Sequence, residues 1–304
     1  MSKKIAVHEI INFLDSDVIN VFGNVDDVFI KYLKPTELVD KYTLDWIGIL
    51  KQNKQNIAEQ TKSDVIICDS SVGYTELIKQ QNKILIHVSN PKMAVAMVAN
   101  HFFIAKPSPG INITSFIHPE AEIASSVYIG ANCSIGKCKI GEGTNIFSNV
   151  TIYNDVIIGN NVIVQAGAVI GTDGLGCERK EDGTLVKFSH LGGVVIGNNV
   201  EIGANCQIAR GALTDTIIGD GTKINGLCFI AHNCVLGNNV LITGNTMLAG
   251  SVKVEDNATI YSGVIIREQR KIGKGSTIGM GSVVIKDVPA GETWLGNPAK
   301  KVIK

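Results

Sequence analysis

The sequence has no surplus of charge and few aromatic residues. In 304 residues, 28 lysines and arginines balance 28 aspartates and glutamates, and aromatic residues make up only 6%. Without a basic excess or stripe, the chain has no field that attracts nucleic acid or an anionic membrane. No apolar run has membrane-spanning length, and no signal-peptide core follows the basic N-terminus. We therefore predict a cytoplasmic protein that neither binds nucleic acid nor inserts into a membrane.

The seven cysteines form no recognisable pattern. There is no CxxC pair and no metal-ligand spacing, and an odd count argues against a disulfide framework. Several lie in the repeat region described next, where a thiol serves as a small buried apolar group. The cysteines therefore predict neither a metal site nor redox catalysis.

A branched aliphatic residue recurs at every sixth position in the second half of the chain. A period of six fits neither the helical period of 3.6 nor strand alternation, and it is typical of a parallel β-helix. Each short strand buries one aliphatic side chain, and small or turn-forming residues often follow it at the corner. The unbroken series is Ile218, Ile224, Ile230, Leu236, Ile242, Leu248, Val254, Ile260, Ile266, Ile272, Ile278 and Val284.

The same period begins at Ile117 and has three interruptions: a one-residue deletion, a long segment and a short slip before Ile218. The long segment, residues 171–193, is rich in glycine and charge. We expect this excursion to cover a ligand or a neighbouring subunit. We predict eight or nine coils over residues 111–287, followed by a loop and tail over residues 288–304.

Residues 1–105 lack the six-residue period and are typical of a small α/β domain. A breaker cluster at residues 106–110 marks the expected boundary between the two domains. Asn90 and Pro91 are typical of an N-cap and a first helical turn. We expect buried strands over residues 64–68 and 84–88, and helices over residues 5–14, 74–81 and 92–103.

Histidine is the main candidate for catalysis in the repeat region. The interior of a β-helix is filled, so a site must lie outside, in a groove between neighbouring prisms. Only His118, His190 and His232 occur within residues 111–304. His232 stands two positions after the buried Ile230 and therefore points outward. A neutral imidazole there suits removal of a proton from an amine or hydroxyl nucleophile, although an ordinary surface histidine fits the spacing equally well.

The six-residue pattern resembles the hexapeptide-repeat acyltransferases, whose coils are left-handed. Over nearly the whole chain the sequence is similar to the UDP-3-O-acylglucosamine N-acyltransferase family of lipid A synthesis. The residues before the repeats also resemble that family's nucleotide-binding domain. The resemblance implies a left-handed parallel β-helix, mainly β, preceded by a small α/β domain. The matching motifs are residues 149–153, 171–176, 210–219 and 230–233.

This resemblance assigns roles to particular residues. It makes His232 the general base that deprotonates a sugar amine as the amine attacks a thioester, with Asn233 orienting the ring. The backbone N–H of Gly250 would bind the oxyanion, although a corner glycine is the alternative. Asp173 would contact substrate or, alternatively, stabilise its turn. His190, at the end of the same excursion, is a second candidate for substrate binding.

Three departures from the lipid A family bear on the substrate. A second histidine of that family aligns with Gln269, and its uracil-binding motif is poorly kept over Gly48–Asn53, although Trp46 could stack on a base. The family's C-terminal helical extension, which grips acyl carrier protein, is missing. In its place residues 296–300 resemble the ending of enzymes that use a short acyl-CoA.

A short acyl-CoA donor implies contacts near the C-terminus. We expect Lys286, Asn297 and Lys300 to bind CoA, and Lys301 is a further candidate for its phosphates. For each lysine, a solvated surface charge is the alternative. No metal is expected.

We therefore predict an N-acyltransferase that transfers a short acyl group from acyl-CoA to a dTDP- or UDP-linked amino sugar for surface polysaccharide or O-antigen. Direct attack without an acyl-enzyme and a homotrimer are expected. The first alternative is the lipid A N-acyltransferase itself, with a β-hydroxyacyl carrier protein as donor. Others are a γ-type carbonic anhydrase, which needs three zinc-binding histidines, and a non-catalytic scaffold.

Overall fold

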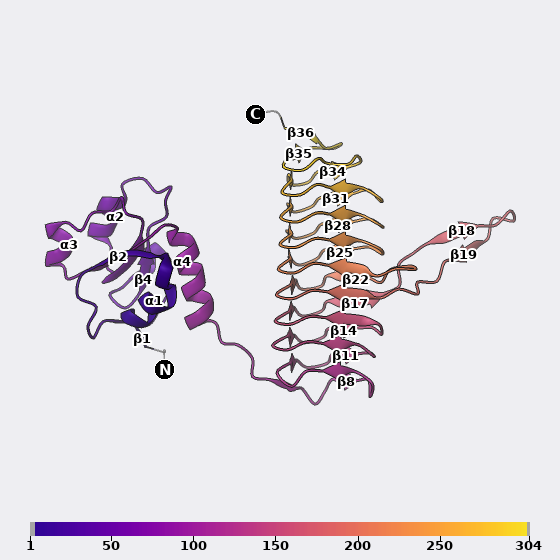
Figure 1. Cartoon of the computed structure of the whole chain (residues 1–304), viewed down its shortest axis with the longest axis horizontal. Helices are drawn as coiled ribbons and strands as arrows, with labels where there is room; N and C mark the ends of the chain where they lie inside the picture. Colours follow the sequence, from indigo (N-terminus) through magenta and orange to yellow (C-terminus); the bar gives the residue numbers. More distant parts are fainter. Residues whose placement is uncertain (1–3, 303–304) are drawn as a thin grey trace. The chain divides into compact units, whose positions relative to one another are not determined.

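The computed structural model describes residues 4–302 and divides into two compact units, Met1–Lys106 and Pro107–Lys304 (Figure 1). No helix in that described range is long and apolar enough to span a bilayer.

The first unit is an α/β domain built on a four-stranded sheet of order β2-β6-β5-β4. The last three strands run parallel, and β2 is antiparallel to β6. Alternate residues point to opposite faces, so Val65 and Ile67 join one apolar cluster while Ile66 and Cys68 join another. The elements are β1 Ile5–Ala6, α1 Val7–Leu14, β2 Val18–Phe22, β3 Phe29–Ile30, β4 Leu44–Trp46, α2 Lys54–Gln60, β5 Val65–Cys68, α3 Glu76–Gln80, β6 Ile84–Val88 and α4 Pro91–Val98.

The strands and helices predicted for this unit are confirmed. The Asn90 side chain accepts a hydrogen bond from the Met93 N–H at 3.1 Å, and Pro91 opens α4. The α4 helix ends at Val98 and is followed by a π-helical turn, Ala99–Phe103. The sequence did not predict β2, β3, β4 or α2, and Ile5–Ala6, expected at the start of the first helix, form β1 instead.

The second unit is a parallel β-helix with three long sheets. Corresponding residues in successive coils are eighteen positions apart, as in the pairs Ile224–Ile242 and Ile230–Leu248. The sheets contain eleven, nine and eight strands. The second and third match the eight or nine coils expected, and the first has two more strands from the C-terminal segment. Figure 1 shows the coils stacked along one axis.

Apart from the arm and the C-terminal end, each sheet collects every third strand of the second unit. The first sheet holds β7 Gly110–Ile111, β10 Tyr128–Ile129, β13 Asn145–Ile146, β16 Ile163–Val164, β21 Glu201–Ile202, β24 Lys223–Ile224, β27 Leu241–Ile242, β30 Thr259–Ile260, β33 Thr277–Ile278, β35 Thr293–Leu295 and β36 Lys300–Lys301. The second holds β8 Phe116–Ile117, β11 Ser134–Ile135, β14 Thr151–Ile152, β17 Val169–Thr172, β22 Gln207–Ala209, β25 Phe229–Ile230, β28 Met247–Leu248, β31 Ile265–Ile266 and β34 Val283–Val284. The third holds β9 Glu122–Ile123, β12 Lys139–Ile140, β15 Val156–Ile158, β20 Val194–Ile196, β23 Thr216–Ile218, β26 Val235–Leu236, β29 Lys253–Val254 and β32 Lys271–Ile272.

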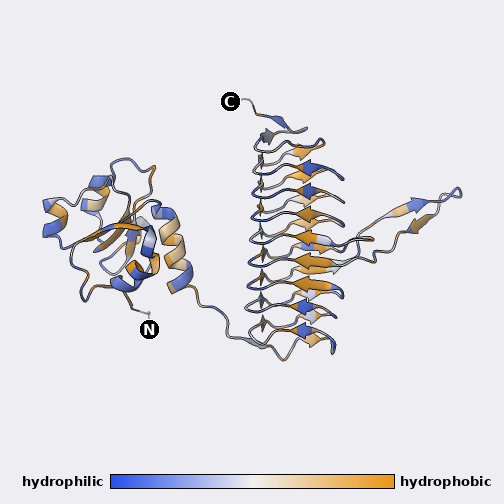
Figure 2. Cartoon of the chain, viewed as in Figure 1, coloured by the Kyte–Doolittle hydropathy of each residue, from blue (hydrophilic) through white to orange (hydrophobic). Residues whose placement is uncertain are grey.

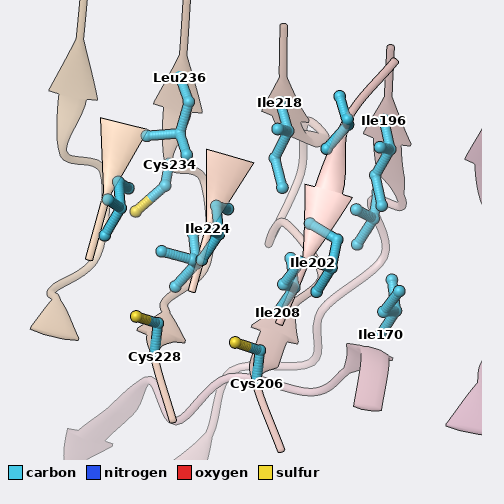
Figure 3. Packing of buried hydrophobic residues seen from close by; sticks show 14 of the residues in the cluster. Ile170, Ile196, Ile202, Cys206, Ile208, Ile218, Ile224, Cys228, Cys234 and Leu236 are labelled. Atoms are coloured by element: carbon cyan, nitrogen blue, oxygen red, sulfur yellow. The ribbon is translucent and has the colours of Figure 1, made fainter. Parts of the chain in front are cut away.

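The core of the second unit is a column of aliphatic side chains. Figure 2 shows both hydrophobic and hydrophilic strands, because many strands pair one polar residue with one buried aliphatic residue. Ile196, Ile218 and Leu236 point inward in successive coils (Figure 3). Cys206, Cys228 and Cys234 lie two residues before such an aliphatic residue and are buried with it. Burial raises the pKa of the Cys234 thiol to about 12, which keeps it protonated and unreactive.

The interruptions of the period have clear structural counterparts. Ile123 pairs with Ile140, seventeen positions later, where the sequence showed the one-residue deletion. Ile158 pairs with Ile196, so residues 173–193 leave the prism between two coils. This segment, called the arm below, contains an antiparallel hairpin of β18 Cys177–Arg179 and β19 Leu185–Lys187 and extends away from the prism (Figure 1).

The C-terminal segment is more ordered than the loop expected over residues 288–304. Strand β35 pairs in parallel with β33, and β36 folds back antiparallel to β35. Trp294 stands in register with Ile278 and packs against the core. A large aromatic side chain there covers the open end of the aliphatic column, so the segment continues the prism for one more strand.

Candidate active site

His232 lies at the outer corner that follows β25. Ile230 is fully buried and Ala231 nearly so, while His232 is half-buried at the turn. Gly250 holds the equivalent position one coil later, because β25 pairs with β28. A Cβ on Gly250 would lie 2.7 Å from both Cε1 and Nε2 of His232. The imidazole therefore rests against the backbone of Gly250, and only a glycine leaves room for it.

Asn233 fixes the tautomer of His232. Its Oδ1 accepts a hydrogen bond from the Ala212 N–H at 3.1 Å, and its Nδ2 donates to the Thr214 carbonyl at 3.2 Å and the Thr214 hydroxyl at 2.9 Å. These partners set the orientation of the amide. Oδ1 also lies 3.0 Å from Nδ1 of His232, so Nδ1 must carry the hydrogen. Nε2 is then left with a free lone pair, as a general base requires.

The Gly250 N–H donates no hydrogen bond within residues 4–302. At the corners that follow strands of the third sheet, the backbone N–H at the equivalent position donates a hydrogen bond to a side chain of the next coil. The N–H of Asn198 donates to Oδ1 of Asp220 at 2.6 Å, and that of Asp220 donates to Oδ1 of Asn238 at 2.8 Å. At the corner of His232 this series is absent, so a donor stands free beside the imidazole. This suits stabilisation of an oxyanion.

The arm brings His190 to His232. The two ring centroids are 5.1 Å apart with an interplanar angle of 73°. Nδ1 of His190 donates to the Phe188 carbonyl at 3.1 Å, which leaves Nε2 as an acceptor. Burial, and after it the neighbouring His232, lower the pKa of His190, so His190 is neutral near pH 7.

Arg210 and Gly174 hold the arm in this place. Nε of Arg210 donates to the Gly192 carbonyl at 2.6 Å, and its backbone N–H donates to the Thr172 carbonyl at 2.8 Å, so it binds both ends of the arm. Its guanidinium also pairs with Asp155 at 2.8 Å. A Cβ on Gly174 would be 2.7 Å from Nε2 of His190 and 2.9 Å from Cδ2 of His232. Glycine thus permits the close approach of arm and prism.

Asp173 is occupied by an ion pair within the arm. Its carboxylate lies 2.5 Å from Nζ of Lys187, and both side chains are about half exposed. The hydrogen bond from Lys187 lowers the pKa of Asp173, so this carboxylate is ionised. This geometry favours a role in shaping the arm over direct contact with substrate.

The residues expected to bind a donor lie further along the prism. Lys286 occupies the same corner position as His232, three coils later in the second sheet, and its side chain is exposed. At ~4.8 Å per coil, the two positions are about 14 Å apart along the axis. Asn297 precedes a cis peptide bond to Pro298, and Lys300 is exposed in β36. Lys301 forms an ion pair with Glu292 instead.

Trp46 and Gln269 are the two remaining residues that the sequence singled out. Trp46 ends β4 in the first unit, where 37% of its surface is exposed. Gln269 occupies a left-handed corner with φ of 59°, and its N–H donates to the Gly250 carbonyl at 2.9 Å. Gln269 thus contacts the Gly250 carbonyl, although the residue that stacks on Gly250 in the next coil is Glu268.

The three histidines do not assemble into one group. His118 lies after β8, and its Nδ1 accepts a hydrogen bond from the Glu120 N–H at 3.1 Å. In the described part of a single chain, no three histidine, cysteine or acidic side chains are placed to hold a metal ion. The three-histidine zinc site of a carbonic anhydrase therefore finds no support within one chain.

Ala212 and Thr214 support Asn233, a role that sequence reasoning missed. They lie in the slip before Ile218, where Val195 pairs with Ile217, twenty-two positions later rather than eighteen. The extra residues bulge outward and reach Asn233. The slip in the six-residue period before Ile218 is the sequence signal that could have located these hydrogen-bond partners of Asn233.

Known proteins share both the sequence pattern and the fold. Residues 137–172 match the family model described as bacterial transferase hexapeptide (six repeats). The UDP-3-O-acylglucosamine N-acyltransferase of Coxiella burnetii is 44% identical over 198 residues, covering 59% of this chain and 56% of that protein. The chain thus spans little more than half the length of this curated relative.

Solved structures extend the likeness to the whole prism fold. LpxA from Acinetobacter baumannii aligns with a TM-score of 0.58 and 32% identity, over 63% of this chain and 73% of that chain. UDP-N-acetylglucosamine acyltransferase from Francisella novicida aligns with a TM-score of 0.57 and 29% identity, over 63% and 68% of the two chains. These matches identify the coils as the left-handed β-helix expected from the sequence.

Proposed function

Because this chain belongs to the bacterial transferase hexapeptide family, we propose that it is an N-acyltransferase acting on a UDP-linked amino sugar. The observation that carries the proposal is the pairing of two groups at one corner. The Nε2 lone pair of His232 is left free by the bond between Nδ1 and Asn233, and the Gly250 N–H beside it is also free. A base next to an oxyanion donor is the arrangement that acyl transfer to a nucleophile requires.

The reaction follows from these positions. The sugar amine attacks the carbonyl carbon of a thioester, and a C–N bond forms as Nε2 of His232 takes a proton from the nitrogen. The negative charge that develops on the carbonyl oxygen is stabilised by the Gly250 N–H. The C–S bond then breaks, and the imidazolium returns its proton to the leaving thiolate. Amide and thiol are the products, and no acyl-enzyme is formed.

The names of the relatives support the alternative from the lipid A family better than the main expectation. The Coxiella protein is named for UDP-3-O-acylglucosamine as acceptor, and we propose the same acceptor here, with an acyl carrier protein as donor. A short acyl-CoA donor, for a dTDP- or UDP-sugar of a surface polysaccharide, is the second candidate. It is favoured by Gln269 beside Gly250, where the family has its second histidine, and by Lys286, which lies within reach of a bound CoA along the corner.

The sugar nucleotide requires a second surface and a cleft. Trp46 is the last residue of β4, at the carboxyl end of a strand that pairs in parallel with β5, and ligands bind at that edge of α/β sheets. We propose that its ring stacks on the base. His232 lies on an outer corner of one prism, so a neighbouring chain must complete the cleft, and we propose a homotrimer.

A matrix of donors and acceptors tests the proposal. Purified full-length protein is mixed with UDP-3-O-acylglucosamine or UDP-glucosamine, and with 3-hydroxyacyl carrier protein or acetyl-CoA, and products are identified by mass spectrometry. An N-acylated UDP-3-O-acylglucosamine formed only from the carrier protein is expected. Product formed only from acetyl-CoA would support the second candidate, and no amide product from any pair would contradict the function. Trp46→Ala should weaken nucleotide-sugar affinity more than donor affinity.

A further inference from the structure

His190 carries a buried acceptor atom without a partner. Only 6% of the side chain is exposed, and its Nε2 has no hydrogen-bond partner among residues 4–302. Leaving a buried acceptor unpaired costs free energy that the fold must offset, so such atoms usually serve a purpose in the working protein. The tautomer cannot change to relieve this cost, because Nδ1 is held by the Phe188 carbonyl at 3.1 Å.

The unpaired atom lies beside the ring of the candidate general base. A Cβ on Gly174 would stand 2.7 Å from Nε2 of His190 and 2.9 Å from Cδ2 of His232, the ring carbon that is bonded to Nε2. Because Nε2 of His190 is enclosed, a ligand reaches it only when the arm shifts at Gly174. The ring centroids are 5.1 Å apart, so a small group then held between the rings can bond to both, since two hydrogen bonds of about 3 Å span roughly 6 Å. Both histidines have the same tautomer, with Nδ1–H bound to an oxygen atom and Nε2 unprotonated.

Two neighbouring hydrogen-bond acceptors, Nε2 of His190 and Nε2 of His232, favour a bound group that has more than one hydrogen to donate. A hydroxyl has one hydrogen to donate, whereas a primary amine has two, and an ammonium has three. We propose that Nε2 of His190 accepts a hydrogen bond from the second N–H of the substrate amine, and so selects an amine over a hydroxyl as the nucleophile. This inference rests on the proposed acyl transfer and names a residue that decides between N- and O-acylation.

The charged groups around His190 are compatible with this role. Asp173 and Lys187 face it from the arm and neutralise each other in an ion pair, and Arg210 is held by Asp155. His232 is the other titratable group in contact with it. Because burial keeps His190 neutral, it does not compete with His232 for the proton that leaves the amine.

The test compares two nucleotide sugars that differ only at the reacting group, UDP-glucosamine and UDP-glucose. Their affinities for the full-length wild type, His190→Phe and His190→Gln are measured by calorimetry, and acylation is followed with the donor that the wild type accepts. The wild type should bind the amine more tightly than the hydroxyl compound. His190→Phe should reduce that preference about tenfold, and His190→Gln, which offers an oxygen acceptor, should restore part of it.

Binding and turnover distinguish the two levels of the proposal. If the wild type prefers the amine but forms no amide product, the acyl-transfer function is wrong while the role of His190 in amine binding stands. If His190→Phe keeps the full preference, or the wild type has none, the inference about His190 is overturned. Thermal unfolding of both variants shows whether either substitution has disturbed the arm. If His190→Gln is destabilised and loses the preference for the amine as fully as His190→Phe does, the inference about His190 is also contradicted.

Discussion

The Nδ1 atom of His232 lies 3.0 Å from Oδ1 of Asn233, whose amide orientation is fixed by the Ala212 N–H and by Thr214. The relationship joins neighbours in sequence, but it depends on a segment twenty-one residues earlier, because Ala212 lies in the preceding coil. The base is thus oriented by the stacking of coils rather than by its own turn.

Replacing Asn233 with alanine should lower kcat by about tenfold or more. Without Oδ1 the imidazole can place its hydrogen on either nitrogen, and the fraction with a free Nε2 falls. Steady-state kinetics at pH 7.5 measure the loss.

The matched control for this variant is Asn239→Ala. Asn233 and Asn239 occupy corners with φ of 59° and 54°, so alanine strains the backbone similarly at both. Asn233→Ala should lose more stability in urea unfolding, because its side chain also bonds to Ala212 and Thr214, but both variants should stay folded and only Asn233→Ala should lose activity. Equal loss of kcat in the two variants would show that Asn233 acts only through the fold.

Replacing Gly250 with alanine should abolish most of the activity. The new Cβ would lie 2.7 Å from Nε2 of His232 and force the ring out of place. Gly244→Ala provides the control, since Gly244 holds the equivalent position on another corner and its Cβ would meet the Gly226 carbonyl oxygen at 3.2 Å. We expect kcat to fall at least a hundredfold in the first variant and less than threefold in the second. A fully active Gly250→Ala would remove this corner from the site.

Leu227 is the one apolar residue among the non-glycine residues described with a left-handed backbone. It adopts φ of 62°, whereas the stacked positions in the coils before and after it are Asn205 and Asn245. A branched side chain is strained in that conformation, and asparagine tolerates it. Leu227→Asn should raise the free energy of unfolding by about 0.5–1 kcal/mol, as measured by urea denaturation. The exposed Leu241, in β27, serves for comparison, and Leu241→Asn should give no gain.

The stability of the protein should fall in mild acid, in part through His87. This side chain is buried, its Nε2 has no partner in the described part of the chain, and burial lowers the pKa of His87. As pH falls below the ordinary value of about 6.5, the unfolded chain binds a proton that the folded protein does not, so stability is lost. His87→Leu should reduce the fall in unfolding free energy between pH 7.5 and 5.5. The exposed His8→Leu should leave it unchanged, and equal falls in all three proteins would exclude His87 as a cause.

The architecture could be predicted because its cause is local and repeated. The aliphatic residue at every sixth position is buried for the same reason. The series from Ile218 to Val284 therefore specifies both strands and coils without any knowledge of distant contacts. The position of His232 followed from the same rule. The N-cap at Asn90 could be predicted for a similar reason, since its side chain bonds to a residue only three positions away.

The support of the site could not be predicted in this way. Asn233 depends on Ala212 and Thr214, which reach it only because four extra residues alter the spacing between two coils. The meeting of His190 and His232 depends on the path of the arm, which no period describes. The tail was expected to leave the prism, and the stacking of Trp294 over the core shows that one aromatic residue can replace the aliphatic repeat.

The most direct test of the central claim is the turnover of His232→Ala with the nucleotide sugar and thioester that the wild type uses. The account predicts a kcat at least a hundredfold below that of the wild type, with nucleotide-sugar affinity nearly unchanged, since the imidazole moves a proton and does little of the binding. A variant that forms the amide at a rate close to the wild type would contradict the assignment of this corner as the catalytic site.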